Sequence, residues 1–239
     1  MSHLPVLCLI HGHGVDASIW DGIYADLVSD AQVLKPDFAR LTNHKTIEAY
    51  AEDLYARLQS AQVSSVVLVG HSMGGYMALA FAEQHPEMVQ GLILYHSTAT
   101  ADDEKRKEIR RQTIDELKAQ GTVPFIQKQL PKMVATTYPS EKTQVLIDRF
   151  LDLPVDALIA GVEAIAGRPD RTNVLRTAQF PILLVLGRED QLMPFEKTAQ
   201  QAELSDKITV TPIENAGHLS MVEQPEAAIQ AIRSFIAQL

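Results

Sequence analysis

The 239-residue chain lacks features that mark several classes of protein. Its single cysteine, Cys8, excludes an internal disulfide and a cysteine-rich metal site. Lys and Arg number 21 against 30 Asp and Glu, and the net charge of -9 disfavours nucleic acid as a partner. No apolar run is long enough to span a bilayer, and the run 4–10 is too short and lacks the basic leader of a signal peptide. We therefore expect a cytoplasmic protein that binds neither nucleic acid nor a membrane.

Short apolar runs alternate with segments of helical pattern along most of the chain. Helical patterns cover 46–61, 73–84 and a last segment that begins at about Pro225. This alternation predicts an α/β domain with a mostly parallel sheet of about six strands and helices on both faces. Ligands of such sheets bind beyond the carboxyl ends of the strands. The predicted strands are Val6–Ile10, Gln32–Lys35, Val66–Val69, Gly91–Tyr95, Ile182–Leu186 and Ile208–Pro212.

The segment 97–179 interrupts the alternation, because it shows helical patterns broken by Gly and Pro and no convincing strand. One interpretation is an enlarged crossover connection between two strands. We favour an inserted helical lid over the sheet edge, since several short helices exceed what one crossover needs. Residues 1–96 and 180–239 would then form the core. Within the segment, the mixed charges of 102–107 predict the solvated start of a helix.

The apolar run 66–69 leads directly into Gly70-His71-Ser72-Met73-Gly74-Gly75. A G-x-S-x-G motif between a strand and a helix is typical of a sharp turn that exposes a serine hydroxyl as a nucleophile. The amide of Met73 would lie at the helix N-terminus, where unpaired N–H groups stabilise an anion. The alternative interpretation is a glycine-rich loop after a buried strand, without a catalytic role. The predicted strand before the motif and the predicted helix after it favour a nucleophile.

A serine nucleophile needs a general base and an acid that orients the base. His218 follows the last predicted strand and is our candidate base, with His96 as a weaker alternative at another strand end. His71 adjoins the serine and suits a packing or hydrogen-bonding role, whereas His3, His44 and His85 are expected at the surface. The loop after Ile182–Leu186 offers two carboxylates, Glu189 and Asp190, of which we prefer Asp190.

The order Ser72, Asp190, His218 resembles the α/β-hydrolase superfamily, whose nucleophile, acid and histidine follow one another in this order. The resemblance covers nearly the whole chain and also includes His11-Gly12 after the first strand and Gly217-His218 before the last helix. It implies an oxyanion hole made by the backbone N–H groups of His13 and Met73. The family's leading antiparallel hairpin is missing here, so we expect a trimmed sheet.

Within the superfamily, the length, the helical lid and His71-Ser72-Met73-Gly74-Gly75 look similar to small bacterial carboxylesterases and enol-lactonases. The resemblance implies hydrolysis of a small, partly apolar ester, thioester or lactone through an acyl-enzyme, with no metal and no organic cofactor. The same triad also serves carbon–carbon bond hydrolysis, hydroxynitrile lysis, acyl transfer and cofactor-free peroxidation. A ligand-binding receptor with a retained triad is an alternative of another class.

Substrate specificity is expected to depend on apolar side chains of the lid and on the loop after the first strand. In the absence of other signals, the lid side chains would form the interior of the lid, and the His13 side chain would face solvent on a loop whose amide alone matters. The sequence leaves the natural substrate and the oligomeric state open. The candidate substrate-binding residues are His13, Phe125, Leu130, Met133, Leu158 and Val162.

Overall fold

The six predicted strands are all present, and they pair in parallel in one sheet of order β2-β1-β3-β4-β5-β6. The computed structural model describes residues 4–239. Within that range the sheet has six strands and only parallel pairings. The predicted α/β class is confirmed. The strands are β1 (Val6–Ile10), β2 (Gln32–Leu34), β3 (Val66–His71), β4 (Val89–Tyr95), β5 (Ile182–Gly187) and β6 (Ile208–Ile213).

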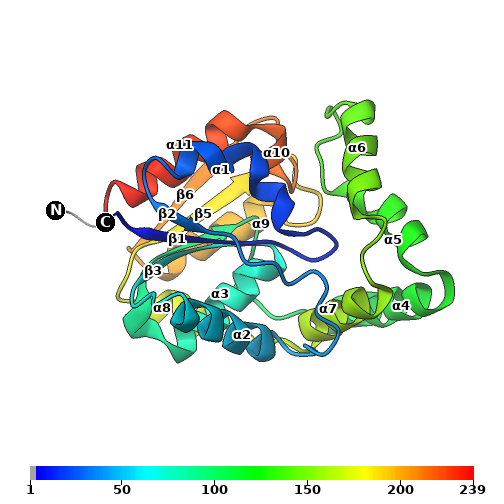
Figure 1. Ribbon diagram of the computed structural model, residues 1–239, viewed down its shortest axis with the longest axis horizontal. Coiled ribbons are helices and arrows are strands. Elements are labelled where there is room, and N and C mark those ends of the chain that lie inside the picture. Colours follow the sequence, from blue (N-terminus) through cyan, green and yellow to red (C-terminus); the bar gives the residue numbers. More distant parts are fainter. Residues whose placement is uncertain (1–3) are drawn as a thin grey trace.

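Helices cover both faces of the sheet. Figure 1 shows α1 and α11 on one face and α2, α3 and α8 on the other. The helical pattern of 46–61 forms α2, and Thr46 is its N-cap, because the Thr46 side chain accepts a hydrogen bond from the Ala49 N–H. The α-helices are α1 (Asp21–Leu27), α2 (Ile47–Ser60), α3 (Met73–Gln84), α4 (Glu104–Gln120), α5 (Thr122–Gln129), α6 (Ser140–Phe150), α7 (Val155–Gly167), α8 (Thr172–Thr177), α9 (Phe195–Ala199), α10 (Ser220–Glu223) and α11 (Pro225–Ile236).

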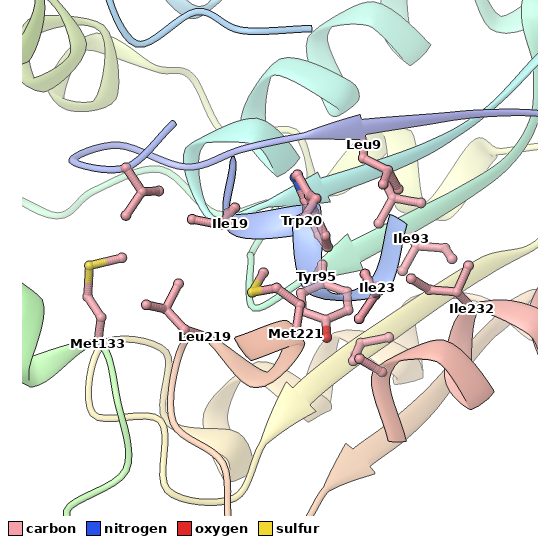
Figure 2. Packing of buried hydrophobic residues seen from close by; sticks show 14 of the residues in the cluster. Leu9, Ile19, Trp20, Ile23, Ile93, Tyr95, Met133, Leu219, Met221 and Ile232 are labelled. Atoms are coloured by element: carbon pink, nitrogen blue, oxygen red, sulfur yellow. The ribbon is translucent and has the colours of Figure 1, made fainter. Parts of the chain in front are cut away.

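The alternation of side chains along each strand divides the interior into two cores. On β1, Leu9 packs with the α1 and α11 layer, whereas Cys8 packs with the α2 and α3 layer. Figure 2 shows the first core, in which Trp20 lies beside Tyr95 of β4. Their rings meet edge to face at 5.3 Å. This packing fixes the end of β4, from which one side of the candidate site is built.

The 97–179 segment contains α4 to α8 and no strand in the described structure. Figure 1 shows α4, α5, α6 and α7 together at one end of the sheet. That end carries the carboxyl termini of the strands, because residues of α4 and the turn that follows β3 line a common cavity. The last helix, α8, instead packs against α3 beside the sheet. None of the helices described is long and apolar enough to cross a bilayer.

Candidate active site

Ser72 occupies the sharp turn between β3 and α3. Its backbone has φ 52° and ψ -115°, which places an L-residue in a strained conformation. The Ser72 N–H donates to the Tyr95 carbonyl at 2.9 Å, and the Ser97 hydroxyl donates to the Ser72 carbonyl at 2.7 Å. Gly74 is required by close approach, since a Cβ there would lie 2.5 Å from the Ile10 carbonyl oxygen. The neighbouring strands thus hold the serine in the strained turn.

His218 and Asp190 are joined by a short buried hydrogen bond. His218 Nδ1 lies 2.7 Å from Asp190 Oδ2, while Asp190 Oδ1 accepts the N–H groups of Leu192 and Met193 at 2.9 Å each. Burial alone would raise the pKa of Asp190, but the charges and hydrogen bonds of His218 and His96 hold that pKa well below its ordinary value. The carboxylate therefore stays ionised. It keeps the proton of a neutral His218 on Nδ1, so that Nε2 can accept another.

His96 is a second histidine on the same carboxylate oxygen. It follows β4 with φ 49°, and its fully buried ring places Nδ1 3.0 Å from Asp190 Oδ2. The Gly187 N–H also faces this nitrogen at 3.2 Å, but the ionised carboxylate lies nearer, so we assign the proton to Nδ1. His96 Nε2 then accepts from the Ser220 hydroxyl at 2.7 Å, and the Ser220 oxygen accepts from the Tyr95 hydroxyl at 2.6 Å. A buried chain of hydrogen bonds thus connects the sheet to Asp190.

His96, Asp190 and His218 also have the donor types of a metal site, with ligand atoms within 4.8 Å of one another. The nitrogen–oxygen distances of 2.7 Å and 3.0 Å are those of hydrogen bonds. Burial lowers the pKa of His96, although its contact with Asp190 opposes this shift. The arrangement is that of one carboxylate which orients two imidazoles.

A cavity of about 230 Å³ opens at Ser72 and His218, and its size suits a small molecule. His13 and Met133 contribute to its walls. Among the described residues that line it, none is a lysine. No hydrogen bond joins the Ser72 hydroxyl to His218 in the described structure, and such bonds are often long before substrate binds.

The loop that carries His13 is tied to α7. His13 and Met73 both border a smaller hollow of about 20 Å³, and His13 also borders the larger cavity. The His13 ring donates from Nε2 to the Leu158 carbonyl at 2.8 Å. Burial lowers the pKa of His13 to about 4, so its ring is neutral near pH 7. Some backbone hydrogen bonds in residues 4–239 lie outside the helices and strands. In none of them is the N–H group of His13 or Met73 the donor.

Four of the candidate substrate-binding residues do not line the cavity that holds Ser72. Leu130, which follows α5, and Val162 of α7 are buried in the core. Leu158 borders only the small hollow, and Phe125 meets the His13 ring edge to face at 5.7 Å. Burial of Leu130, Leu158 and Val162 agrees with the default expectation that such side chains form the interior of the lid. His13 and Met133 do line the cavity that holds Ser72.

Among the described residues, no other histidine makes a hydrogen bond with Asp190. His71 is fully buried, its Nε2 lies 2.9 Å from the His218 carbonyl, and burial holds its pKa well below the ordinary value. It therefore supports the backbone of the His218 loop. His44 and His85 are partly exposed, at 22% and 20% of their side chains. His3 lies outside the described residues.

Glu223 is a buried carboxylate that no sequence motif predicts. It accepts hydrogen bonds from the N–H groups of Ala135, Gly217 and Leu219 at 2.7 to 3.1 Å. Burial raises its pKa, although these amides oppose the shift. Glu223 thereby joins the loop of His218 to the 97–179 segment. No local motif marks a glutamate with this role, because its three partners come together only in the fold.

The charged run 102–107 begins a helix as predicted, with the Asp103 side chain accepting the Arg106 N–H at 2.8 Å. The expectation that the run is solvated is wrong at Asp102. Asp102 is buried among arginines, and Arg106 lines the cavity with Ser72. The spacing of Asp102, Arg106 and Arg110 at every fourth residue is the signal that could have revealed a shared helix face.

Relatives among characterised and uncharacterised proteins match this chain at moderate to low identity. An uncharacterized protein from Mycobacterium tuberculosis is 33% identical over 41% of this chain, and the match spans only 31% of that protein. A probable esterase from Oryza sativa is 24% identical over 95% of this chain and 89% of its own length. The karrikin insensitive 2 receptor IA of Petunia hybrida is 23% identical over 95% and 88%. The full-length relatives thus include both a probable esterase and a receptor.

Solved structures share the fold of this chain over almost its whole length. A thermophilic esterase from Thermogutta terrifontis, in a malate-bound structure, superposes with a TM-score of 0.93 at 28% identity, over 99% of this chain and 90% of that one. The enol-lactonase from Burkholderia xenovorans shares the fold, with a TM-score of 0.89 at 19% identity over 99% and 92%. The model of the alpha/beta hydrolase family matches residues 6–231. The chain therefore belongs to the alpha/beta hydrolase family.

Proposed function

We propose that this protein is a serine hydrolase that cleaves small, partly apolar carboxylic esters, thioesters or lactones. In this proposal Ser72 is the nucleophile, His218 the general base and Asp190 the acid that orients it. The observation that carries the proposal is the strained Ser72 and the His218–Asp190 hydrogen bond at one cavity. The similarity to an esterase and a lactonase supports the same class of reaction.

Acylation begins when Ser72 Oγ attacks the carbonyl carbon of the substrate and His218 Nε2 takes the hydroxyl proton. The carbonyl oxygen becomes an oxyanion, which accepts hydrogen bonds from the amides of His13 and Met73. Each such donor contributes about 3 kcal/mol to transition-state stabilisation. The intermediate then collapses, the bond to the leaving group breaks, and His218 returns the proton to the departing oxygen or sulfur.

Deacylation repeats these steps with water. His218 Nε2 takes a proton from the water as its oxygen attacks the acyl-enzyme, and the second tetrahedral intermediate breaks the bond to Ser72 Oγ. The proton returns to Ser72, and the carboxylic acid leaves. Asp190 stays ionised throughout and holds the imidazolium that forms in both steps. In this scheme α4 to α7 act as the lid that limits the size of the substrate.

A fluorophosphonate probe and mass spectrometry test the proposal. We expect stoichiometric mass addition on the peptide that contains Ser72, and a burst of chromogenic alcohol from an activated ester before steady turnover. The burst reports an acyl-enzyme. Labelling of another residue, or turnover without any acyl-enzyme, would contradict the assigned nucleophile.

A receptor is the second candidate, because the petunia relative is named as one. It would be favoured if a ligand raised the melting temperature of the protein while ester turnover stayed negligible. A hydroxynitrile lyase would require a lysine-assisted site, and none of the described cavity-lining residues is a lysine. The cavity therefore supports the esterase over that lyase.

Gly161 on α7 provides the space that the His13 ring occupies. A Cβ at this position would lie 2.5 Å from His13 Cδ2. We expect Gly161→Ala to displace the ring and its loop, and to lower kcat/KM for a small ester by about 10- to 100-fold. Gly167→Ala is the matched control on the same helix, because a Cβ there meets nothing within 4 Å. Equal kcat/KM values for the two variants would show that the position of the His13 ring does not matter.

A further inference from the structure

Two arginines of α4 face the cavity that holds Ser72. Arg106 and Arg110 lie four residues apart, so their side chains project from the same side of the helix. Both line the cavity together with Ser72 and His218, and about a third of each side chain is exposed. No Asp or Glu lines the cavity in the described part of the chain. The walls therefore carry positive charge although the whole protein carries a net charge of -9.

The nearest carboxylate balances only part of this charge. Asp102 Oδ1 lies 2.9 Å from Arg168 Nη2, its Oδ2 lies 3.1 Å from Arg110 Nε, and Arg106 Nη1 is 4.0 Å from Oδ1. Three guanidinium groups thus share one buried anion. Arg168 is covered and lies 4.0 Å above the Tyr76 ring, so it belongs to the interior. The excess positive charge remains on the two arginines at the cavity.

Most hydrogen-bond donors of these two arginines have no acceptor in the protein. Arg110 uses Nε towards Asp102, and its two terminal amino groups make no hydrogen bond within residues 4–239. The Arg106 guanidinium makes none to any described residue, since its contact with Asp102 at 4.0 Å is too long. A planar guanidinium presents paired N–H groups that match the oxygens of a carboxylate or phosphate. A ligand with such a group would satisfy both the charge and the donors.

We propose that Arg106 and Arg110 form a subsite for an oxyanion group, a carboxylate or a phosphate, on the substrate. The preferred substrates are then small anionic esters, thioesters or lactones, with the ester at Ser72 and the anion at α4. This inference rests on the proposed serine hydrolase and adds a substrate class to it. The cavity of about 230 Å³ places both groups of one small molecule within reach.

Matched esters that differ only in charge test the subsite. One pair is mono(4-nitrophenyl) glutarate and 4-nitrophenyl pentanoate, which places the carboxylate on the acyl side. The second pair is 4-butyryloxybenzoate and phenyl butyrate, which places it on the alcohol side. We expect the protein to favour the charged ester of at least one pair in kcat/KM by about tenfold or more, the size expected of a charge-assisted hydrogen bond.

Substitutions at the arginines should change this ratio in a charge-dependent way. We expect Arg106→Gln to lower the charged-to-neutral ratio of kcat/KM by about tenfold, whereas Arg106→Lys retains most of it. Arg110→Gln should act likewise, but it also removes a partner of Asp102, so its melting temperature must be measured alongside. Arg111→Gln is the matched control on α4, because Arg111 is 59% exposed and pairs with Glu108 outside the cavity. It should leave the ratio unchanged.

The outcomes separate this inference from the proposed function. If Ser72 is labelled and neutral esters are cleaved, but neither pair shows a preference that Arg106→Gln removes, the subsite is disproved and the serine hydrolase stands. If no ester is cleaved and Ser72 is not labelled, the proposed function fails. The subsite is then tested by the binding of anions. Glutarate or inorganic phosphate should then raise the melting temperature of the protein but not of the Arg106→Gln/Arg110→Gln double variant. The more effective anion identifies the group, and no shift with either would overturn the subsite.

Discussion

Replacing Ser72 by alanine is expected to lower kcat for a small ester by about a million-fold, the scale on which triad serines act. In the proposed mechanism the change removes the atom that forms the acyl-enzyme, and the remaining cavity can only position the substrate for water. Stability should change little, because alanine replaces serine in the same strained turn and the backbone hydrogen bonds to Tyr95 and Ser97 remain. Initial rates with 4-nitrophenyl esters, together with thermal melting, measure both effects.

Ser64→Ala is a suitable control for this experiment. Ser64 is exposed in the loop that leads into β3, at the opposite end of the strand from Ser72. We expect its activity and melting temperature to match those of the unchanged protein. A Ser72→Ala protein that keeps a tenth of the activity and still reacts with a fluorophosphonate would refute the nucleophile.

Asp190→Asn is expected to lower kcat by about 10⁴-fold, as in triads where the acid is changed to its amide. If the Asn oxygen keeps the hydrogen bonds from Leu192 and Met193, its NH₂ group faces both imidazoles. His218 must then accept on Nδ1 and carry its proton on Nε2, where it cannot take the proton of Ser72. If the amide turns over, two backbone N–H groups lose their acceptor, at a cost of about 1–3 kcal/mol in stability.

Glu189→Gln distinguishes the two carboxylates of this loop. The Glu189 side chain makes no hydrogen bond with a described residue, in contrast to the four contacts of Asp190. We expect Glu189→Gln to retain kcat/KM. Loss of activity in Glu189→Gln together with retention in Asp190→Asn would reverse the assignment of the acid.

The strands could be predicted because parallel strands buried on both faces are continuous apolar runs. Two such runs are Val66–Val69 and Ile182–Leu186. The observed strands β3 and β5 extend beyond these runs to His71 and Gly187, which an apolar pattern cannot include. β4 begins at Val89, two residues before the predicted start at Gly91. The exposed Gln90 interrupts its apolar pattern, although Val89 pairs with Val66.

The candidate site was predicted where local sequence carries the signal. Ser72 is marked by its glycines, and Asp190 and His218 by their positions after strands. The contact of His96 with Asp190 has no local mark, because it depends on the direction of a ring from a residue with φ 49°. The position of Arg106 at the cavity could not be predicted, because charge alone does not show which side of a helix faces a cavity.

Because two histidines share Asp190 Oδ2, the number of protons on their rings determines the net charge of the site. With both rings neutral, the cluster of His96, Asp190 and His218 holds one negative charge, and in the proposed mechanism the imidazolium of the transition state brings the charge to zero. A proton on His96 would bring the cluster to zero before the reaction starts and leave a second cation beside His218, which opposes catalysis. Burial holds the pKa of His96 below its ordinary value, which keeps this ring neutral and prevents that second positive charge.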